Sequence, residues 1–298
     1  MSEYDKSHFF FCAILFMFVN KFTIMLHILL PTDFSEASLH AIEYALLLFG
    51  NESPEFHLLN VYDIPPTNGG SLISMHEVIK QSREEDMKEL IDNLTTKYRI
   101  LHPQFRFFIE PGNISSNIQA LNKEYQYDFI VMGTTGASGL KEVLLGSTAS
   151  SVIQNVHLPV FVIPEKAPII APTSIALAVN QNQIPEDASK LLAYLVEKFN
   201  SKLHLIHIEN SKDPLHLDLD DVAGELRKYL PGHIEIYQSS EKNEKTEEAI
   251  LDYLSEHDIH LLVTLHKKRN FIQKLFSTSF TKQLAMHVNT AMLSIPLK

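Results

Sequence analysis

A glycine-bearing stretch at residues 131–152 contains residue types that could bind a phosphate group. It reads VMGTTGASGLKEVLLGSTASSV and follows a short apolar run. Glycines at 133, 136 and 146 would let the backbone approach a ligand closely, and successive backbone N–H groups in such a loop can hold an anion. Ser147 is expected to start the next helix, whose free N–H groups and positive dipole end favour a phosphate. The glycines alone also fit a plain turn, with Ser147 as an ordinary helix cap.

Other catalytic or metal-binding patterns are absent from the sequence. The glycine loop has no G-K-[ST] of a Walker A motif, and no H-E-x-x-H or G-x-S-x-G sequence occurs in the chain. The 15 histidines are scattered, so His57 and His204 are interpreted as packed strand residues. The single cysteine, Cys12, excludes an intrachain disulfide and a cysteine-based zinc site.

Apolar runs and helical periodicities alternate through the first half of the chain. Ser35 is expected to cap a helix that ends at Gly50. The alternation is typical of a doubly wound α/β fold, in which ligands bind at the carboxyl ends of the strands. The predicted strands are 24–30, 56–61, 105–109, 129–132 and 160–163, and the other predicted helices are 74–98, 114–124 and 147–155.

The second half repeats the first. HLLNV at 57–61 returns as HLIHI at 204–208, and PVFVIP at 159–164 returns as AMLSIP at 291–296. A repeat of this length indicates duplicated domains and not a solenoid. We therefore predict two tandem, mainly parallel five-stranded sheets with helices on both faces, in domains 25–165 and 173–298. A proline-rich linker, 166–172, joins them.

The N-terminal segment, residues 1–24, is treated separately. Its apolar run FFFCAILFMFV is too short to span a membrane, since that takes about 20 residues. We expect that Met25 is the natural start and that the segment is an over-extended reading frame. An ordered or membrane-associated extension and an export signal are the alternatives.

Composition indicates a soluble globular protein. The chain is 45% hydrophobic and 20% charged, with a net charge of −11. An acidic surface argues against nucleic-acid binding, which depends on basic side chains that neutralise phosphates. We expect a cytoplasmic protein.

The spacing Gly133-x2-Gly136-x9-Gly146-Ser147 resembles the G-x2-G-x9-G-[ST] motif of ATP-binding universal stress proteins. The opening ILLPTDFSEAS resembles the first strand and turn of that family, and the resemblance extends twice over nearly the whole chain from Met25. It implies an adenine-nucleotide hydrolase-like, Rossmann-like fold and one ATP site, with Mg²⁺ as the accompanying cation.

The resemblance also implies a role for each matching residue of the first domain. Asp33 matches the acidic residue beside the adenosine, and Val61 matches the position whose backbone meets the adenine edge. Met132 and Gly133 match positions around the ribose and phosphates. Core packing for Val61 and Met132, and a turn or cap for Asp33, are the alternative roles.

The phosphate-contacting positions of the family match Gly136, Gly146 and Ser147. Ala137 departs from the family, because many members carry Lys or Arg at that place. A phosphate-facing cation is therefore missing from the motif, and Lys141 either replaces it or is solvated.

The second domain does not keep the loop. Leu265, Lys268 and Thr278 stand where the first domain has its three glycines, and Asn180 stands in place of Asp33. Only Ser279 matches its counterpart, Ser147. The basic run 266–269 is interpreted as a solvated loop, with an anion or protein contact as the alternative. We therefore expect one nucleotide site per chain.

The leading hypothesis is a stress-response binding protein regulated by ATP, and not an enzyme. A slow ATPase or phosphoryl-transfer enzyme and a nucleotide-free dimerisation scaffold are the alternatives. The apolar fifth strands of the two domains, 159–163 and 291–295, are expected to pair edge to edge. That pairing would form an intramolecular pseudo-dimer or a homo-oligomer.

Overall fold

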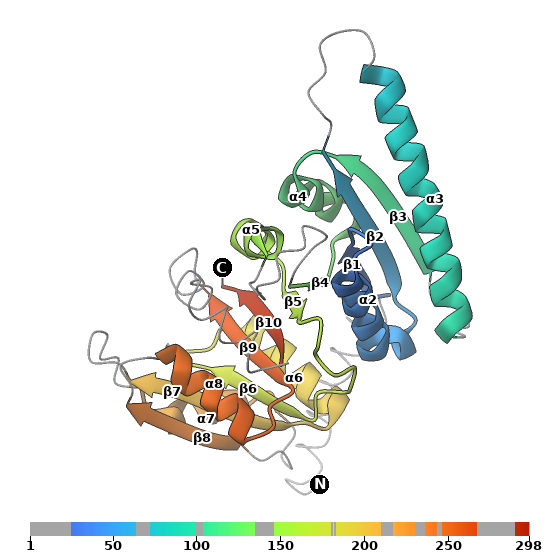
Figure 1. Ribbon diagram of the computed structural model, residues 1–298. Helices are drawn as coiled ribbons and strands as arrows, with labels where there is room; N and C mark the ends of the chain where they lie inside the picture. The colour runs from blue at the N-terminus through green and yellow to red at the C-terminus, as the bar shows by residue number, and fades with distance from the viewer. Residues whose placement is uncertain are drawn as a thin grey trace, which may run out of the picture.

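The computed structural model describes most of the chain (Figure 1). The predictions for residues 1–24, Gly136, Ala137 and Lys141 lie outside the described residues, as do those for Asn180 and residues 267–289. The described residues are 25–63, 72–98, 104–134, 146–179, 181, 183–209, 217–230, 236–242, 246–266 and 290–297.

The first half contains the predicted strands and helices, with ends that agree to within three residues. The elements are β1 His27–Pro31, α2 Glu36–Phe49, the short 3₁₀-helix η1 Gly50–Glu52, β2 Glu55–Tyr62, α3 Leu72–Tyr98, β3 Gln104–Pro111, α4 Ile114–Tyr125, β4 Phe129–Gly133, α5 Ser147–Asn155 and β5 Val160–Ile163.

Helices α2 and α4 start at side-chain caps. Ser35 accepts a hydrogen bond from the backbone N–H of Ser38 at 3.3 Å, and Asn113 accepts one from Ser116 at 3.1 Å. Each cap satisfies a backbone donor that the helix leaves free. The predicted cap at Ser35 is therefore confirmed.

The second half repeats these elements in the same order. Strands β6 and β7 start 147 residues after β1 and β2, and β9 starts 132 residues after β4. The internal repeat read from the sequence is therefore a repeat of structure. The elements are β6 Ser174–Ala178, α6 Glu186–Phe199, β7 Lys202–Glu209, α7 Leu219–Arg227, β8 Ile236–Lys242, α8 Thr246–Glu256, β9 Leu261–His266 and β10 Ala291–Pro296.

The two predicted five-stranded sheets are the halves of one continuous sheet. Its ten strands follow the order β3-β2-β1-β4-β5-β10-β9-β6-β7-β8. Neighbouring strands are parallel except β5 and β10, which pair in antiparallel orientation. The predicted edge-to-edge pairing of the fifth strands is confirmed within the chain.

The register of this pairing relates the two halves by a pseudo-two-fold axis. Phe161 pairs with Leu293, and the two occupy equivalent places in the repeat, 132 residues apart. On either side, Val162 pairs with Met292 and Val160 with Ser294. Because exchanging the halves gives the same pairs, the pseudo-axis passes between Phe161 and Leu293.

Helices cover both faces of the sheet. On one face, α2, α3, α6 and α7 share a single apolar core that runs under both halves. On the other face, α4 and α5 cover the first half and α8 covers the second, over separate cores. The predicted three-layer arrangement is confirmed.

A polar contact links the halves on the α2 side of the sheet. The hydroxyl of Tyr194, on α6, donates to the carboxylate of Glu52 at 2.7–2.8 Å, and Lys198 forms an ion pair with the same group. The first half is thus attached to the second through side chains as well as through β5 and β10.

His266 was predicted to lie in a solvated loop, but it is the last residue of β9 and is buried where the two halves meet. Its Nδ1 lies 3.0 Å from the hydroxyl of Ser294, on β10. The residue is 7% exposed. Burial lowers the pKa of His266 to about 4, although the backbone of Ile153, on α5 of the first half, acts to raise it.

The burial of His266 predicts a loss of stability in mild acid. Its folded pKa, about 4, lies below its ordinary value of 6.5, so the unfolded chain binds the proton first as the pH falls. Neutral, buried His266 makes its full contribution to the free energy of unfolding above pH 6.5. This contribution decreases by roughly 3 kcal/mol as the pH falls from 6.5 to 4. Urea unfolding of the wild type and His266→Gln at pH 7.5 and 4.5 measures it. The variant should lose less stability, and equal losses would contradict the assignment.

Candidate functional site

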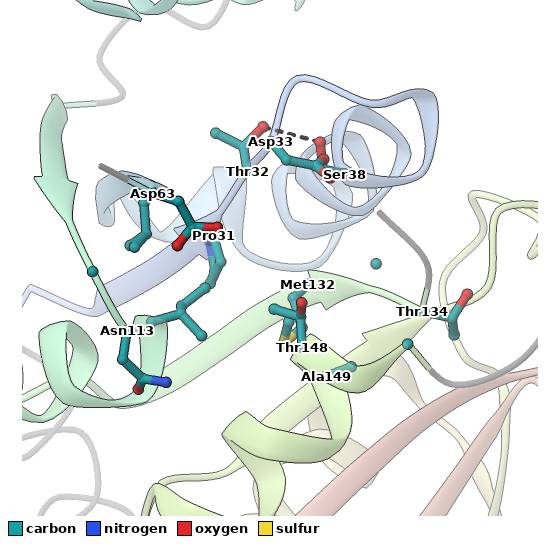
Figure 2. A pocket seen from close by; sticks show the side chains of 15 residues that line it. Pro31, Thr32, Asp33, Ser38, Asp63, Asn113, Met132, Thr134, Thr148 and Ala149 are labelled. Carbon is teal, nitrogen blue, oxygen red and sulfur yellow. Dashed lines mark hydrogen bonds between the residues drawn. The ribbon is translucent and has the colours of Figure 1, made fainter. Parts of the chain in front are cut away.

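A cavity of about 300 Å³ lies at the carboxyl ends of β1, β2 and β4 (Figure 2). Its walls come from the β1–α2 turn, the ends of β2 and β4, and the starts of α4 and α5. The lining residues are Pro31, Thr32, Asp33, Ser38, Val61, Asp63, Gly112, Asn113, Ile114, Met132, Gly133, Thr134, Gly146, Thr148 and Ala149.

Five of the seven site residues predicted from the sequence line this cavity. They are Asp33, Val61, Met132, Gly133 and Gly146. Ser147 is exposed, and the hydroxyl residue of α5 that lines the cavity is Thr148, one position further along. Gly136 lies outside the described residues.

The sequence reasoning missed several polar lining residues. Thr32 and Asp63 directly follow β1 and β2, and Asn113 caps α4 just after β3. The rule that ligands bind at the carboxyl ends of parallel strands could have found all three, because their positions follow from the predicted strand ends.

Asp33 helps to shape the turn between β1 and α2. Its Oδ1 accepts hydrogen bonds from the backbone N–H of Ser35 at 3.1 Å and from the Ser35 hydroxyl at 2.5 Å. Phe34 has a φ of 64°, a left-handed backbone conformation that residues other than glycine rarely adopt. The turn role considered for Asp33 is therefore real, and the same residue also lines the cavity.

The backbone N–H and C=O of Val61 point toward the edge of β2 that pairs with β1, at a position beyond the end of that pairing. On β2, the N–H of Glu55 donates to the carbonyl of Leu26, and the carbonyl of Leu59 accepts from the N–H of Thr32. The backbone groups of every second residue of β2 therefore point toward β1. Val61 continues that series, but the pairing of β1 with β2 ends at Pro31 and Leu59. Within the described residues, its N–H and C=O therefore open toward the cavity.

Helix α5 directs its N-terminus toward the same cavity. Its N-cap residue is Gly146, which has no side chain to accept from the first N–H groups, whereas α2 and α4 carry side-chain caps. Gly146, Thr148 and Ala149 all line the cavity. This end of the cavity is suited to an anion, because free N–H groups and the helix dipole both favour negative charge.

The charged side chains among the described lining residues are carboxylates. Asp33 and Asp63 line the cavity, and no Lys, Arg or His belongs to this described set. A phosphate bound here would be held by backbone N–H groups and hydroxyls, and a bound cation would offset the carboxylate charge.

Metal centres and membrane-spanning helices are not found in the part of the chain that the structure describes. No three His, Cys, Asp or Glu side chains in it gather as a metal site. None of its helices is long and apolar enough to cross a membrane. His57 and His204 are buried, each beside a tyrosine hydroxyl, Tyr127 at 2.8 Å and Tyr253 at 3.0 Å.

Comparison with known proteins identifies the family. Residues 25–164 match the model of the universal stress protein family. A universal stress protein of Methanocaldococcus jannaschii is 32% identical over 141 residues, which cover 46% of this chain and 80% of that relative. The chain belongs to the universal stress protein family.

Solved structures support the tandem form of this universal stress protein. The match to a universal stress protein from Archaeoglobus fulgidus covers 91% of this chain and 98% of that protein's chain, with a TM-score of 0.67 and 19% identity. This likeness shows the fold. Another universal stress protein, solved in complex with cAMP, covers 46% of this chain and 96% of its own. Its TM-score is 0.32 and its identity 16%, a likeness too low to bear on the ligand of this chain.

Gly133 has a packing role that the sequence did not reveal. A Cβ at this position would lie 2.8 Å from the carbonyl oxygen of Ala37 and 3.3 Å from the backbone nitrogen of Ser38. The end of β4 therefore touches the first turn of α2, and only glycine allows that approach. The predicted ligand role of Gly133 is thus accompanied by a structural one.

The second half of this universal stress protein differs at the corresponding place. Leu265 replaces Gly133 and is buried in the core. Seven residues separate β6 from α6, whereas four separate β1 from α2. The connection before α6 is thus longer in the half that carries leucine at this position.

The packing of Gly133 predicts that Gly133→Ala destabilises the protein by about 1–3 kcal/mol, because backbone atoms of α2 must move. Gly224→Ala is the matched control. Gly224 lies inside α7, and a Cβ there would meet nothing within 4 Å, so alanine should raise stability by about 0.5–1 kcal/mol. Urea denaturation measures both. Equal stability of Gly133→Ala and the wild type would refute the contact.

Proposed function

We propose that this universal stress protein binds one adenine nucleotide in its first half, with ATP as the ligand, and acts as a stress-response regulatory module. The observation that carries the proposal is the pairing of two features in one cavity. At one side, Val61 offers an open backbone donor and acceptor. At another, α5 offers an N-terminus without a side-chain cap.

The open backbone of Val61 suits the edge of adenine. N1 of adenine accepts a hydrogen bond and its 6-amino group donates one, which matches an N–H and a C=O on one extended residue. Guanine presents a donor at N1 and an acceptor at O6, so both contacts would be reversed. A site of this kind rejects the wrong base, because its polar groups would be left unpaired.

The start of α5 suits the phosphates. The first turn of α5 offers backbone N–H groups and the hydroxyl of Thr148 as donors. Glycine at 146 lets the backbone approach an anion closely. Asp33 and Asp63 would repel a bare triphosphate. Mg²⁺ would offset this repulsion, so we expect it to improve ATP binding.

The same features favour a binding module over an enzyme. Hydrolysis requires a group that orients water and a charge that stabilises the transition state. Among the described lining residues, Asp33 is engaged by Ser35 and cationic side chains are absent. The nucleotide-free scaffold is less favoured, because the cavity keeps glycine at 133 and 146 and an uncapped α5.

Titration calorimetry should find one ATP per chain, and Thr148→Glu should weaken binding by about a hundredfold or more, because the new carboxylate faces the phosphates. The helix itself should persist, since an acidic residue in the first turn favours the helix dipole. Ser116→Glu, at the matching turn of α4 and away from the lining, is the control and should bind ATP normally. Two equivalent sites would contradict the single-site proposal.

ATP hydrolysis should be slow, below about 1 s⁻¹, because the described lining supplies no cationic side chain to stabilise charge on the reacting phosphate. Steady-state phosphate release from the purified protein measures it, with Thr148→Glu run beside it to detect a contaminating ATPase. Faster turnover that disappears in Thr148→Glu would place the protein among the enzymes.

A further inference from the structure

Asn60 lies where β1 and β2 separate. Its side chain is 3% exposed, and its Nδ2 donates to the backbone carbonyl of Thr32 at 2.8 Å. The last ladder bond between the two strands runs from the N–H of Thr32 to the carbonyl of Leu59 at 2.9 Å. Asn60 therefore acts at the first place where the ladder does not continue.

In a parallel ladder, the next bond would run from the N–H of Val61 to the carbonyl of Thr32. The described structure has the Asn60 amide on that carbonyl instead. The bond after it would run from the N–H of Phe34 to the carbonyl of Val61, but Phe34 turns back to the Thr32 hydroxyl at 3.1 Å. Among the described residues, neither backbone group of Val61 takes part in the β1–β2 ladder.

We propose that Asn60 is a positioning residue for base recognition: by holding the Thr32 carbonyl, it keeps the Val61 N–H available for N1 of adenine. This inference rests on the proposed adenine-nucleotide function. Asn60 is not among the cavity-lining residues, so it acts through the backbone of its neighbour.

The second half repeats the side-chain bond to the carbonyl that follows its first strand, β6. His207 occupies the place of Asn60, 147 residues later, and its ring lies 3.0 Å from the carbonyl of Val179. The N–H of Val179 bonds to Ile206 at 2.8 Å, as that of Thr32 bonds to Leu59. The side-chain bond to this carbonyl is therefore common to both halves, and His207 provides a matched control.

Loss of the Asn60 amide should let the ladder extend by one bond. In Asn60→Leu, whose side chain has the same number and branching of heavy atoms, the freed Thr32 carbonyl would accept the Val61 N–H that the ligand needs. We expect ATP affinity to fall by about tenfold and the preference for ATP over GTP to shrink. The Val61 amide should also become protected from hydrogen exchange, which general destabilisation would not cause.

Three full-length variants test the inference, by calorimetry with ATP and GTP and by amide exchange. Asn60→Leu should lose affinity and base preference. Asn60→His, which restores a ring donor like that of His207, should bind ATP within about threefold of the wild type. His207→Leu should keep wild-type ATP binding. If circular dichroism shows Asn60→Leu to be unfolded, Asn60→Ala replaces it.

The outcomes separate this inference from the function on which it rests. Failure of the wild type to bind ATP or GTP would overturn both. ATP binding by the wild type with unchanged affinity and base preference in Asn60→Leu would overturn the inference alone. An equal loss of affinity in His207→Leu would also overturn it, since the effect would then come from general destabilisation.

Discussion

The antiparallel pairing of β5 with β10 is the constraint on which the arrangement of this protein depends. An exposed apolar strand edge is open to aggregation, and each half carries one at its fifth strand. By pairing these edges about a pseudo-axis at Phe161 and Leu293, the chain covers both and extends one core under α2, α3, α6 and α7. The site of the first half therefore lies on a sheet ten strands wide.

Much of this fold could be predicted from the sequence, because its signals are periodic and local. Apolar runs, the cap at Ser35 and the repeat at an offset of 147 residues identified strands, helices and duplication. The pairing of the fifth strands was also predictable, since both are apolar and terminal. Both an intramolecular pseudo-dimer and a homo-oligomer fitted that prediction, because sequence alone does not distinguish pairing within a chain from pairing between chains.

The candidate site was only partly predictable, for a different physical reason. Motif spacing predicted Gly133 and Gly146 as ligand-binding positions, and both line the cavity. It could not reveal that Gly133 also touches the first turn of α2, because that contact joins segments about 100 residues apart in the chain. Nor could it show that Thr148, and not Ser147, lines the cavity, since a helix start turns successive side chains in different directions.

The two halves show that the scaffold and the site depend on different properties of the sequence. Strand pairing uses backbone groups and apolar faces, so it tolerates Leu293 opposite Phe161 and His207 in place of Asn60. The close approach of β4 to α2 depends on the absence of a side chain at Gly133, whereas the second half carries the buried Leu265 at that position. A duplicated half can therefore differ at such a position and still supply β10, which covers the edge of the first half.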